Sequence, residues 1–229
     1  TLASGASLDV NGTLTVQTNG DSVFEMLGTS TMTVSGDLTA TSAVTAPFTL
    51  TTVTFDGSSA QSLGGTSTLA YAFGTLTVAN SGASSVTISD RGGATDVSAS
   101  TVNVNDGKLS LAGGAGLDVN GTMTIQTAAD SAFEMLGSSS MTISGNLTVD
   151  TSNSSATSLT SVIFDGTGAQ TIGGSNTSHT LSFGTLTVTN SGASSVTISD
   201  RGGVTDASAT AVSITDGKLS LASGASLDL

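Results

Sequence analysis

Residues 8–16 read LDVNGTLTV, and the spacing of the apolar residues in this stretch decides the fold. The apolar positions share one parity with the central glycine: Leu8, Val10, Gly12, Leu14 and Val16. A period of two predicts β-strands with one buried face and one wet face. Asn11-Gly12 also suits a tight hairpin turn, so a meander of hairpins is the alternative. Because the parity continues through the glycine, we expect a bend in a continuing coil, with Gly12 at a corner where a side chain would crowd.

The apolar triplets of this stretch return 24 residues later along the chain. The first residues of the matched triplets are Leu8 and Met32, Leu14 and Leu38, Phe24 and Phe48, Leu117 and Met141, Met123 and Leu147, and Phe133 and about Leu159. Three short strands in each turn of roughly 20–24 residues are typical of a solenoid. We therefore predict an all-β protein, a parallel β-helix of about ten coils and ~50 Å length with negligible helix.

A longer repeat contains these coils. LASGASLDVNGTLTV from Leu2 returns as LAGGAGLDVNGTMTI from Leu111, and FGTLTVANSGASSVTIS from Phe73 returns as FGTLTVTNSGASSVTIS from Phe183. The sequence thus predicts a first copy over 1–110, a second over 111–220 and the start of a third over 221–229. No Pro-rich or charged spacer separates the copies, so we expect one continuous rod without a linker.

Composition narrows the choice of partners and compartments. Only 9% of the 229 residues are charged, the net charge is −13, and four Lys and Arg residues are the only cations besides one His. So few cations argue against nucleic-acid binding. No apolar run approaches the roughly 18 residues that a membrane span needs, so we expect no membrane insertion in this segment. The absence of Cys removes disulfides and thiolate chemistry.

The sequence offers little for catalysis. It has one His and one Tyr, His179 and Tyr71, in a stretch that differs between the copies, and it has no Trp. No nucleophile elbow, phosphate loop or zinc-ligand spacing is present. Paired carboxylates could cleave glycosidic bonds, but no pair is singled out by its position. We expect no enzyme activity and no cofactor, with a carbohydrate-active β-helix enzyme as the weakest alternative.

One repeated motif suggests a calcium site. SDRGGATD at 89–96 and SDRGGVTD at 199–206 place carboxylates around a glycine pair. The candidate ligands are Asp90, Asp96, Asp200 and Asp206. Oxygen ligands on a flexible turn suit calcium. We favour a surface turn in which Arg91 or Arg201 partly offsets the neighbouring acidic charge, with the calcium site as the alternative.

Thr-x-Thr pairs raise the hypothesis of an ice-binding face, which needs such pairs stacked on successive coils. At the 24-residue step, however, Thr13 and Thr15 fall on Asp37 and Thr39, so that acids interrupt the array. The simpler explanation is that threonine suits exposed strand positions.

The pair TFDGSSAQSLGG and IFDGTGAQTIGG, with the FGTLTV stretch that follows each, resembles the β-strand repeats of large secreted bacterial surface proteins. That group comprises filamentous-haemagglutinin-like and autotransporter-type adhesins and other fibrous exoproteins. The resemblance implies an exported β-solenoid at the cell surface that serves as stalk, filament or adhesive surface.

Both ends of the sequence show the same apolar alternation as the interior coils. A polar cap would interrupt this alternation. We therefore expect the chain's partner to be itself, either through a longer repeat polypeptide or by head-to-tail stacking of subunits. The residues expected to stack are Leu2, Leu8, Val10, Leu219, Leu221, Leu227 and Leu229. The alternative is an adhesin whose divergent loops, 66–72 and 175–182, contact a ligand.

Overall fold

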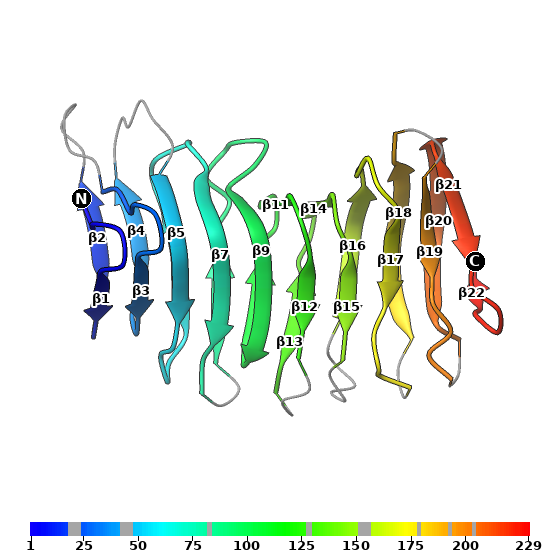
Figure 1. Ribbon diagram of the computed structural model, residues 1–229, viewed down its shortest axis with the longest axis horizontal. Helices are drawn as coiled ribbons and strands as arrows, with labels where there is room; N and C mark the ends of the chain where they lie inside the picture. The colour runs from blue at the N-terminus through cyan, green and yellow to red at the C-terminus, as the bar shows by residue number, and fades with distance from the viewer. Residues whose placement is uncertain are drawn as a thin grey trace.

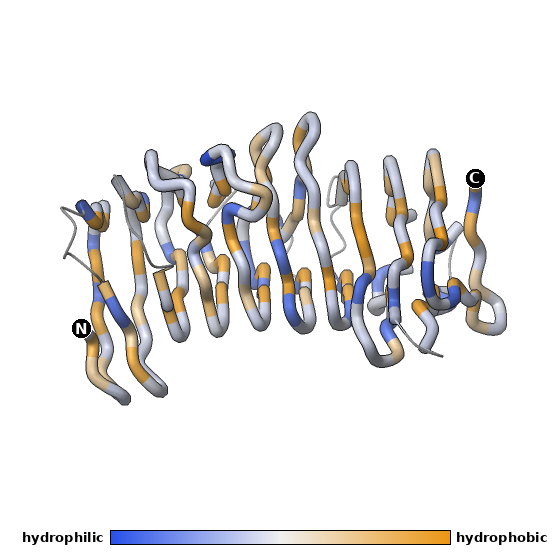
Figure 2. The backbone as a smooth tube through the Cα atoms, turned by 90° about the horizontal axis from the view of Figure 1, so that it is seen from above, coloured by the Kyte–Doolittle hydropathy of each residue, from blue (hydrophilic) through white to orange (hydrophobic). Residues whose placement is uncertain are grey.

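The computed structural model is an elongated β-solenoid whose two termini lie at opposite ends (Figure 1). It describes residues 1–17, 24–41, 48–81, 84–126, 130–150, 157–177, 180–191, 194–202 and 205–229. Seen from above, the chain climbs coil by coil along the long axis (Figure 2). The described residues contain no helix, and hence none that could cross a membrane.

Three sheets of parallel strands form the walls of the rod. Sheet A begins with β1 (Ser7–Val10) and β3 (Thr31–Val34), followed by the second halves of β5 (Phe48–Phe55), β7 (Tyr71–Ala79) and β9 (Val97–Asp106). It continues with β12 (Met123–Ile125), β15 (Leu147–Val149), β17 (Gln170–Gly173), β19 (Ser195–Ile198) and β21 (Lys218–Leu221).

Sheet B follows sheet A in every coil. It stacks β2 (Leu14–Gln17), β4 (Leu38–Thr41), β6 (Gln61–Gly65), β8 (Ser85–Ile88), β10 (Lys108–Leu111) and β13 (Ala132–Met135). The first parts of β16 (Thr157–Phe164), β18 (Leu181–Thr189) and β20 (Ala207–Asp216) continue it to β22 (Leu227–Asp228).

Sheet C closes each coil. It starts at the bridge between Leu2 and Met26 and continues through the first halves of β5, β7 and β9. Then come β11 (Gly116–Val119), β14 (Ser140–Ile143) and the second parts of β16, β18 and β20.

The predicted parallel β-helix of about ten coils is therefore confirmed, since sheets A and B each stack ten of the described strands. Every strand pairing of the described residues is parallel, which makes the hairpin meander wrong. The 24-residue step is correct where β1 pairs with β3, but the next step along sheet A shortens to 21, from Thr31 to Thr52. Phe133 pairs with Thr157 instead of the expected Leu159.

The two sequence copies are out of phase with the three-sided coil. Leu8 pairs with Met32 in sheet A, whereas its counterpart Leu117 pairs with Val97 in sheet C. The next counterpart, Leu227, pairs in sheet B with Ala207. Each copy is thus one strand short of five full coils, and a given sequence position moves to the preceding sheet in every copy.

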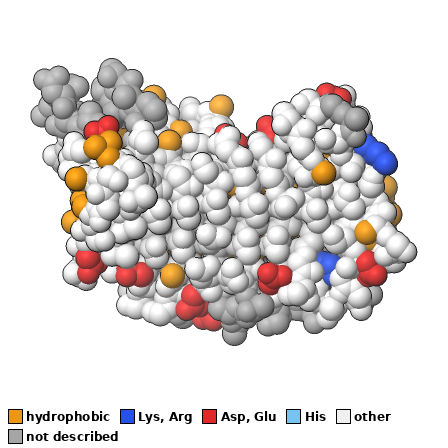
Figure 3. Space-filling view, viewed as in Figure 1, with side chains coloured by type: hydrophobic (Ala, Val, Ile, Leu, Met, Phe, Trp, Pro, Cys, Tyr) orange, Lys and Arg blue, Asp and Glu red, His pale blue; other side chains and the backbone are white. Residues whose placement is uncertain are grey.

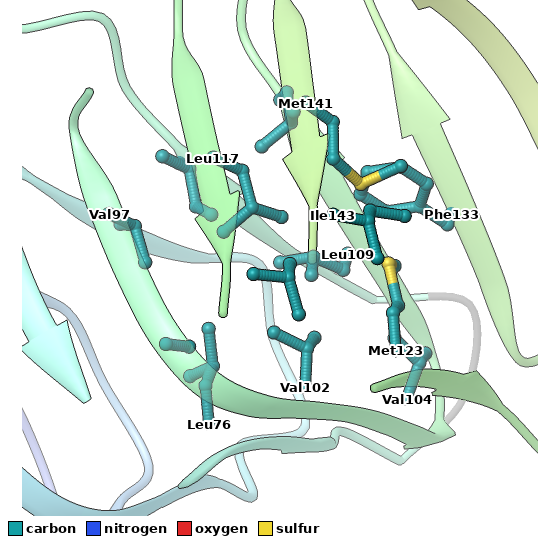
Figure 4. Packing of buried hydrophobic residues seen from close by; sticks show 14 of the residues in the cluster. Leu76, Val97, Val102, Val104, Leu109, Leu117, Met123, Phe133, Met141 and Ile143 are labelled. Atoms are coloured by element: carbon teal, nitrogen blue, oxygen red, sulfur yellow. The ribbon is translucent and has the colours of Figure 1, made fainter. Parts of the chain in front are cut away.

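The period-two alternation produces a dry interior. Leu109 of sheet B, Leu117 of sheet C and Val102 of sheet A meet inside the coil (Figure 4), and all three are at most 2% exposed. Burial of such side chains contributes about 25 cal/mol for each Å² of apolar surface removed from water, and each coil adds its share.

The predicted steric crowding at the corner glycine Gly12 is absent from that residue and present at Gly36. A Cβ on Gly12 would have nothing within 4 Å, so the predicted crowding at this residue is wrong. The crowding falls on the coil above, where a Cβ on Gly36 would lie 2.5 Å from the carbonyl carbon of Gly12.

Gly65 is the glycine whose replacement we expect to cost most. Its φ is +123°, and a Cβ there would overlap the backbone of Ala40. Gly65→Ala should therefore lower the free energy of unfolding by roughly 2–4 kcal/mol, through backbone strain and overpacking. Gly12→Ala, the same change in open space, should stay within about 0.5 kcal/mol. Urea unfolding of both variants checks this, and equal losses would contradict it.

Candidate functional site

The first coil leaves its apolar side chains incompletely covered. Leu2, Leu8 and Val10 pack against the core but remain partly exposed. Their counterparts one copy later lie between two coils and are 0%, 2% and 0% exposed: Leu111, Leu117 and Val119. The second copy thus shows that a neighbouring coil buries these positions.

The last coil exposes larger apolar side chains. Leu221 is 49%, Ile214 51% and Leu229 80% exposed, while Leu219 and Leu227 are partly buried. The counterparts of the three exposed residues are each 0% exposed: Leu111, Val104 and Val119. Ile214 was missed by the sequence analysis, although it ends the alternating run AVSIT at 211–215.

The motif at 89–96 forms a buried ionic corner. The side chains of Arg91 and Asp96 are 0% and 1% exposed, with Nε and Oδ1 3.8 Å apart. Asp96 Oδ1 accepts a hydrogen bond from the amide of Arg91, and Oδ2 accepts one from the amide of Gly116 on the next coil, both at 2.8 Å. Arg91 also donates to the carbonyl oxygens of Ser67 and Asp96. The expected surface turn is therefore wrong for Arg91 and Asp96, while Asp90 is exposed.

The second copy repeats this corner on another side of the rod. Asp206 accepts hydrogen bonds from the amides of Arg201 and Ser226 and from the Ser226 hydroxyl. Burial raises the pKa of Asp206, but these hydrogen bonds and the charge of Arg201 outweigh burial and hold the pKa below its usual value. Burial also lowers the pKa of the Arg201 guanidinium.

The corners give the predicted calcium ligands different surroundings. Asp96 and Asp206 lie inside, bonded to N–H groups, whereas Asp90 and Asp200 lie outside and accept from the amides of Gly92 and Gly202. Among the described residues, no three His, Cys, Asp or Glu side chains converge as a metal site would require. Calcium binding stays the untested alternative for this motif.

Tyr71, at the end of the divergent loop 66–72, faces inward. It is 1% exposed and stacks between Phe48 and Phe73, with ring centroids 5.4 and 6.2 Å away. Its hydroxyl donates to the carbonyl of Gly64 at 2.7 Å, and the guanidinium carbon of Arg91 lies 4.4 Å from the ring centroid. The loop therefore offers no exposed aromatic platform through Tyr71. His179, in the other divergent loop, lies outside the described residues.

Burial raises the pKa of Tyr71 to about 12, despite the opposing charge of Arg91 and a backbone hydrogen bond. The unfolded chain should lose this proton near pH 10, so the free energy of unfolding should fall as pH rises from about 10 to 12, by roughly 2 kcal/mol. Because Tyr71 is the single tyrosine, the absorbance of tyrosinate measures its ionisation directly. Folded protein should titrate well above denatured protein, and Tyr71→Phe should lose this part of the pH dependence. Coincident titrations would contradict the buried placement.

Comparison of the chain with protein-family models, with curated proteins and with solved structures gives no match.

Proposed function

We propose that the chain is a structural segment of an extracellular surface or matrix fibre, in which further coils continue the rod. The observation that carries this proposal is the continuity between copies. β10 spans the copy boundary and pairs with β8 of the first copy and β13 of the second. A rod built in this way accepts any number of copies without a new kind of interface.

The apolar ends support the same proposal. Edge strands with exposed Leu and Ile side chains are templates for another strand, and internal coils bury these positions completely. The further coil comes either from the same polypeptide or from a second subunit stacked head to tail. The likeness to secreted bacterial adhesins and fibrous exoproteins supports placement at a cell surface. The acidic, hydroxyl-rich exterior favours solubility.

Electron microscopy of the purified, concentrated chain, with and without calcium, tests the proposal. Filaments far longer than about 50 Å would support head-to-tail assembly, whereas isolated straight rods would support continuity within one polypeptide. Irregular aggregates, or a chain that is unfolded in solution, would contradict a rod segment of either kind.

Two leucines of similar exposure provide a matched pair of variants for testing head-to-tail assembly. Leu221→Lys places a charge on the end coil, and Leu136→Lys places one on the flank, where Leu136 is 44% exposed. If subunits stack end to end, Leu221→Lys should abolish filaments and leave rods, while Leu136→Lys should leave filaments intact. Loss in the flank variant alone would show lateral association instead.

A further inference from the structure

The outer face of sheet A carries two rows of residues that are mostly threonine, with Asn103, Asn146 and Gly173 as the positions that carry no hydroxyl. The first row, in order along the rod, is Thr31, Thr52, Thr75, Thr101, Thr122, Asn146, Thr171 and Thr197. The second row is Thr33, Thr54, Thr77, Asn103, Thr124, Thr148, Gly173 and Ser199. We call these two rows the threonine face. The 24-residue step of the first coils conceals it, because alignment begins where the step shortens to 21.

The threonine face is uncharged over its whole length. Charges on sheet A lie beside the rows or at the ends of the rod: Asp9 in β1 accepts from Thr33, Lys218 in β21 lies opposite Ser195, and Asp106 ends β9 beyond the second row. Within the described part of the chain, the hydroxyls of Thr54 and Thr77 make no hydrogen bond to protein. They remain available to a ligand.

The other two sheets carry charges on their outer faces. Sheet B holds the ion pair between Lys108 and Glu134, with Nζ and Oε2 2.8 Å apart. Sheet C holds Asp118, whose pKa is raised by partial burial and by the neighbouring Asp165. On the side of the rod seen in Figure 3, acidic side chains lie near the long edges and the band between them is free of acids.

The differences between the two copies keep sheet A rich in threonine. Because the copies are out of phase, Asn146 and Thr171 lie on sheet A, while their first-copy counterparts, Asp37 and Ser62, lie on sheet B. An acid is thus replaced by an amide, and a serine by a threonine, where the position enters sheet A.

The reverse changes occur where a position leaves sheet A for sheet C. At four of the seven first-copy threonines in the rows the second-copy counterpart is not threonine: Thr31 and Ser140, Thr52 and Ser161, Thr54 and Ile163, and Thr101 and Ala211. Thr33, Thr75 and Thr77 keep threonine at their counterparts, and Asn103 becomes Ser213. Repetition of one sequence does not explain this pattern, because identical copies would place the same residues on both sheets.

We propose that the threonine face binds the surface of an ice crystal. Its grid is set by the sheet, with about 4.8 Å between coils and about 6.7 Å between the two rows. Both spacings are close to repeats of the oxygen lattice on the prism face of hexagonal ice. Each threonine supplies a hydroxyl that can take a lattice position and a methyl that covers the gap between positions.

The chemistry of the face favours ice over a macromolecule. The two rows contain no aromatic residue and no Arg, which dominate protein interfaces. They also lack the cations that nucleic acids need. A rigid, neutral and periodic surface is complementary to a neutral and periodic solid.

The test is partitioning of the protein into slowly grown ice, using wild type and a crossed set of threonine-to-lysine variants. Thr77→Lys changes the threonine face within FGTLTV, and Thr187→Lys changes the identical sequence on sheet C. Thr124→Lys changes the threonine face in the second copy, and its first-copy counterpart Thr15→Lys lies on sheet B.

Wild type should enter the ice. Thr77→Lys and Thr124→Lys should lower partitioning about tenfold or more, because an ammonium group must be stripped of water at the contact. Thr187→Lys and Thr15→Lys should partition like wild type. Thermal unfolding verifies that all four variants keep the fold.

Exclusion of wild type from ice would overturn the proposal, as would equal losses in all four variants. The result is independent of fibre formation, because single rods can enter ice and filaments can be excluded from it.

Discussion

Asp96→Ala should lower the free energy of unfolding by roughly 3–5 kcal/mol, the usual cost of leaving a buried charge without its partner. The variant removes the carboxylate that faces the Arg91 guanidinium, and both side chains are at most 1% exposed. It also removes the acceptor of the Gly116 amide, which connects one coil to the next. Urea unfolding followed by circular dichroism measures the loss.

Asp90→Ala is the matched control, because Asp90 belongs to the same motif but is exposed and, among the described residues, accepts only from the nearby Gly92 amide. Its cost should stay below about 1 kcal/mol. Repeating both measurements with calcium separates the two hypotheses for this motif. If calcium stabilised wild type and neither variant, Asp90 and Asp96 would be acting together as metal ligands, contrary to the ionic corner.

Phe133→Ala should cost about 3–5 kcal/mol, since it leaves a large cavity in the interior. Phe133 is 0% exposed in β13, which lies between β10 and β16. A coil in the middle of the rod cannot collapse around the cavity without disturbing both neighbours.

The first-copy counterpart provides the comparison. Phe24 is only partly buried near the first coil, so Phe24→Ala should cost roughly 1–2 kcal/mol. The free energies of unfolding of the two variants, measured under one set of conditions, check the difference. Similar costs would mean that the first coil is covered in solution, as head-to-tail assembly would cause, and dilution would then separate them.

The local sequence pattern was enough to predict the parallel strands that form the walls of the rod and which of their side chains point inward. Alternation at Leu8, Val10, Leu14 and Val16 specifies which side chains point inward, because a strand sends successive residues to opposite faces. The 24-residue recurrence from Leu8 to Met32 is the pairing that β1 and β3 make. Parallel coils, absent helix and apolar columns all follow from these two periods.

The ionic corner could not be predicted in the same way. SDRGGATD has the composition of a surface turn, and Arg91 is buried only because Ser67 and Tyr71 come from the preceding coil to meet it. Such contacts depend on which residues the neighbouring coil supplies, which the local sequence does not contain.

By itself, the sequence determined the coil, its parity and its repeat. Only the tertiary structure decided which sheet each residue joins. That assignment depends on the length of every corner before it, because a step of 21 instead of 24 residues changes which residues of neighbouring coils lie side by side. A copy that is one strand short of five coils then moves Thr77 and Thr187 to different sheets, although their surroundings in sequence are identical. The threonine face follows from this accumulated offset between the sequence copies and the three sheets of the coil. Backbone pairing between coils, and not the repeat in the sequence, aligns its rows.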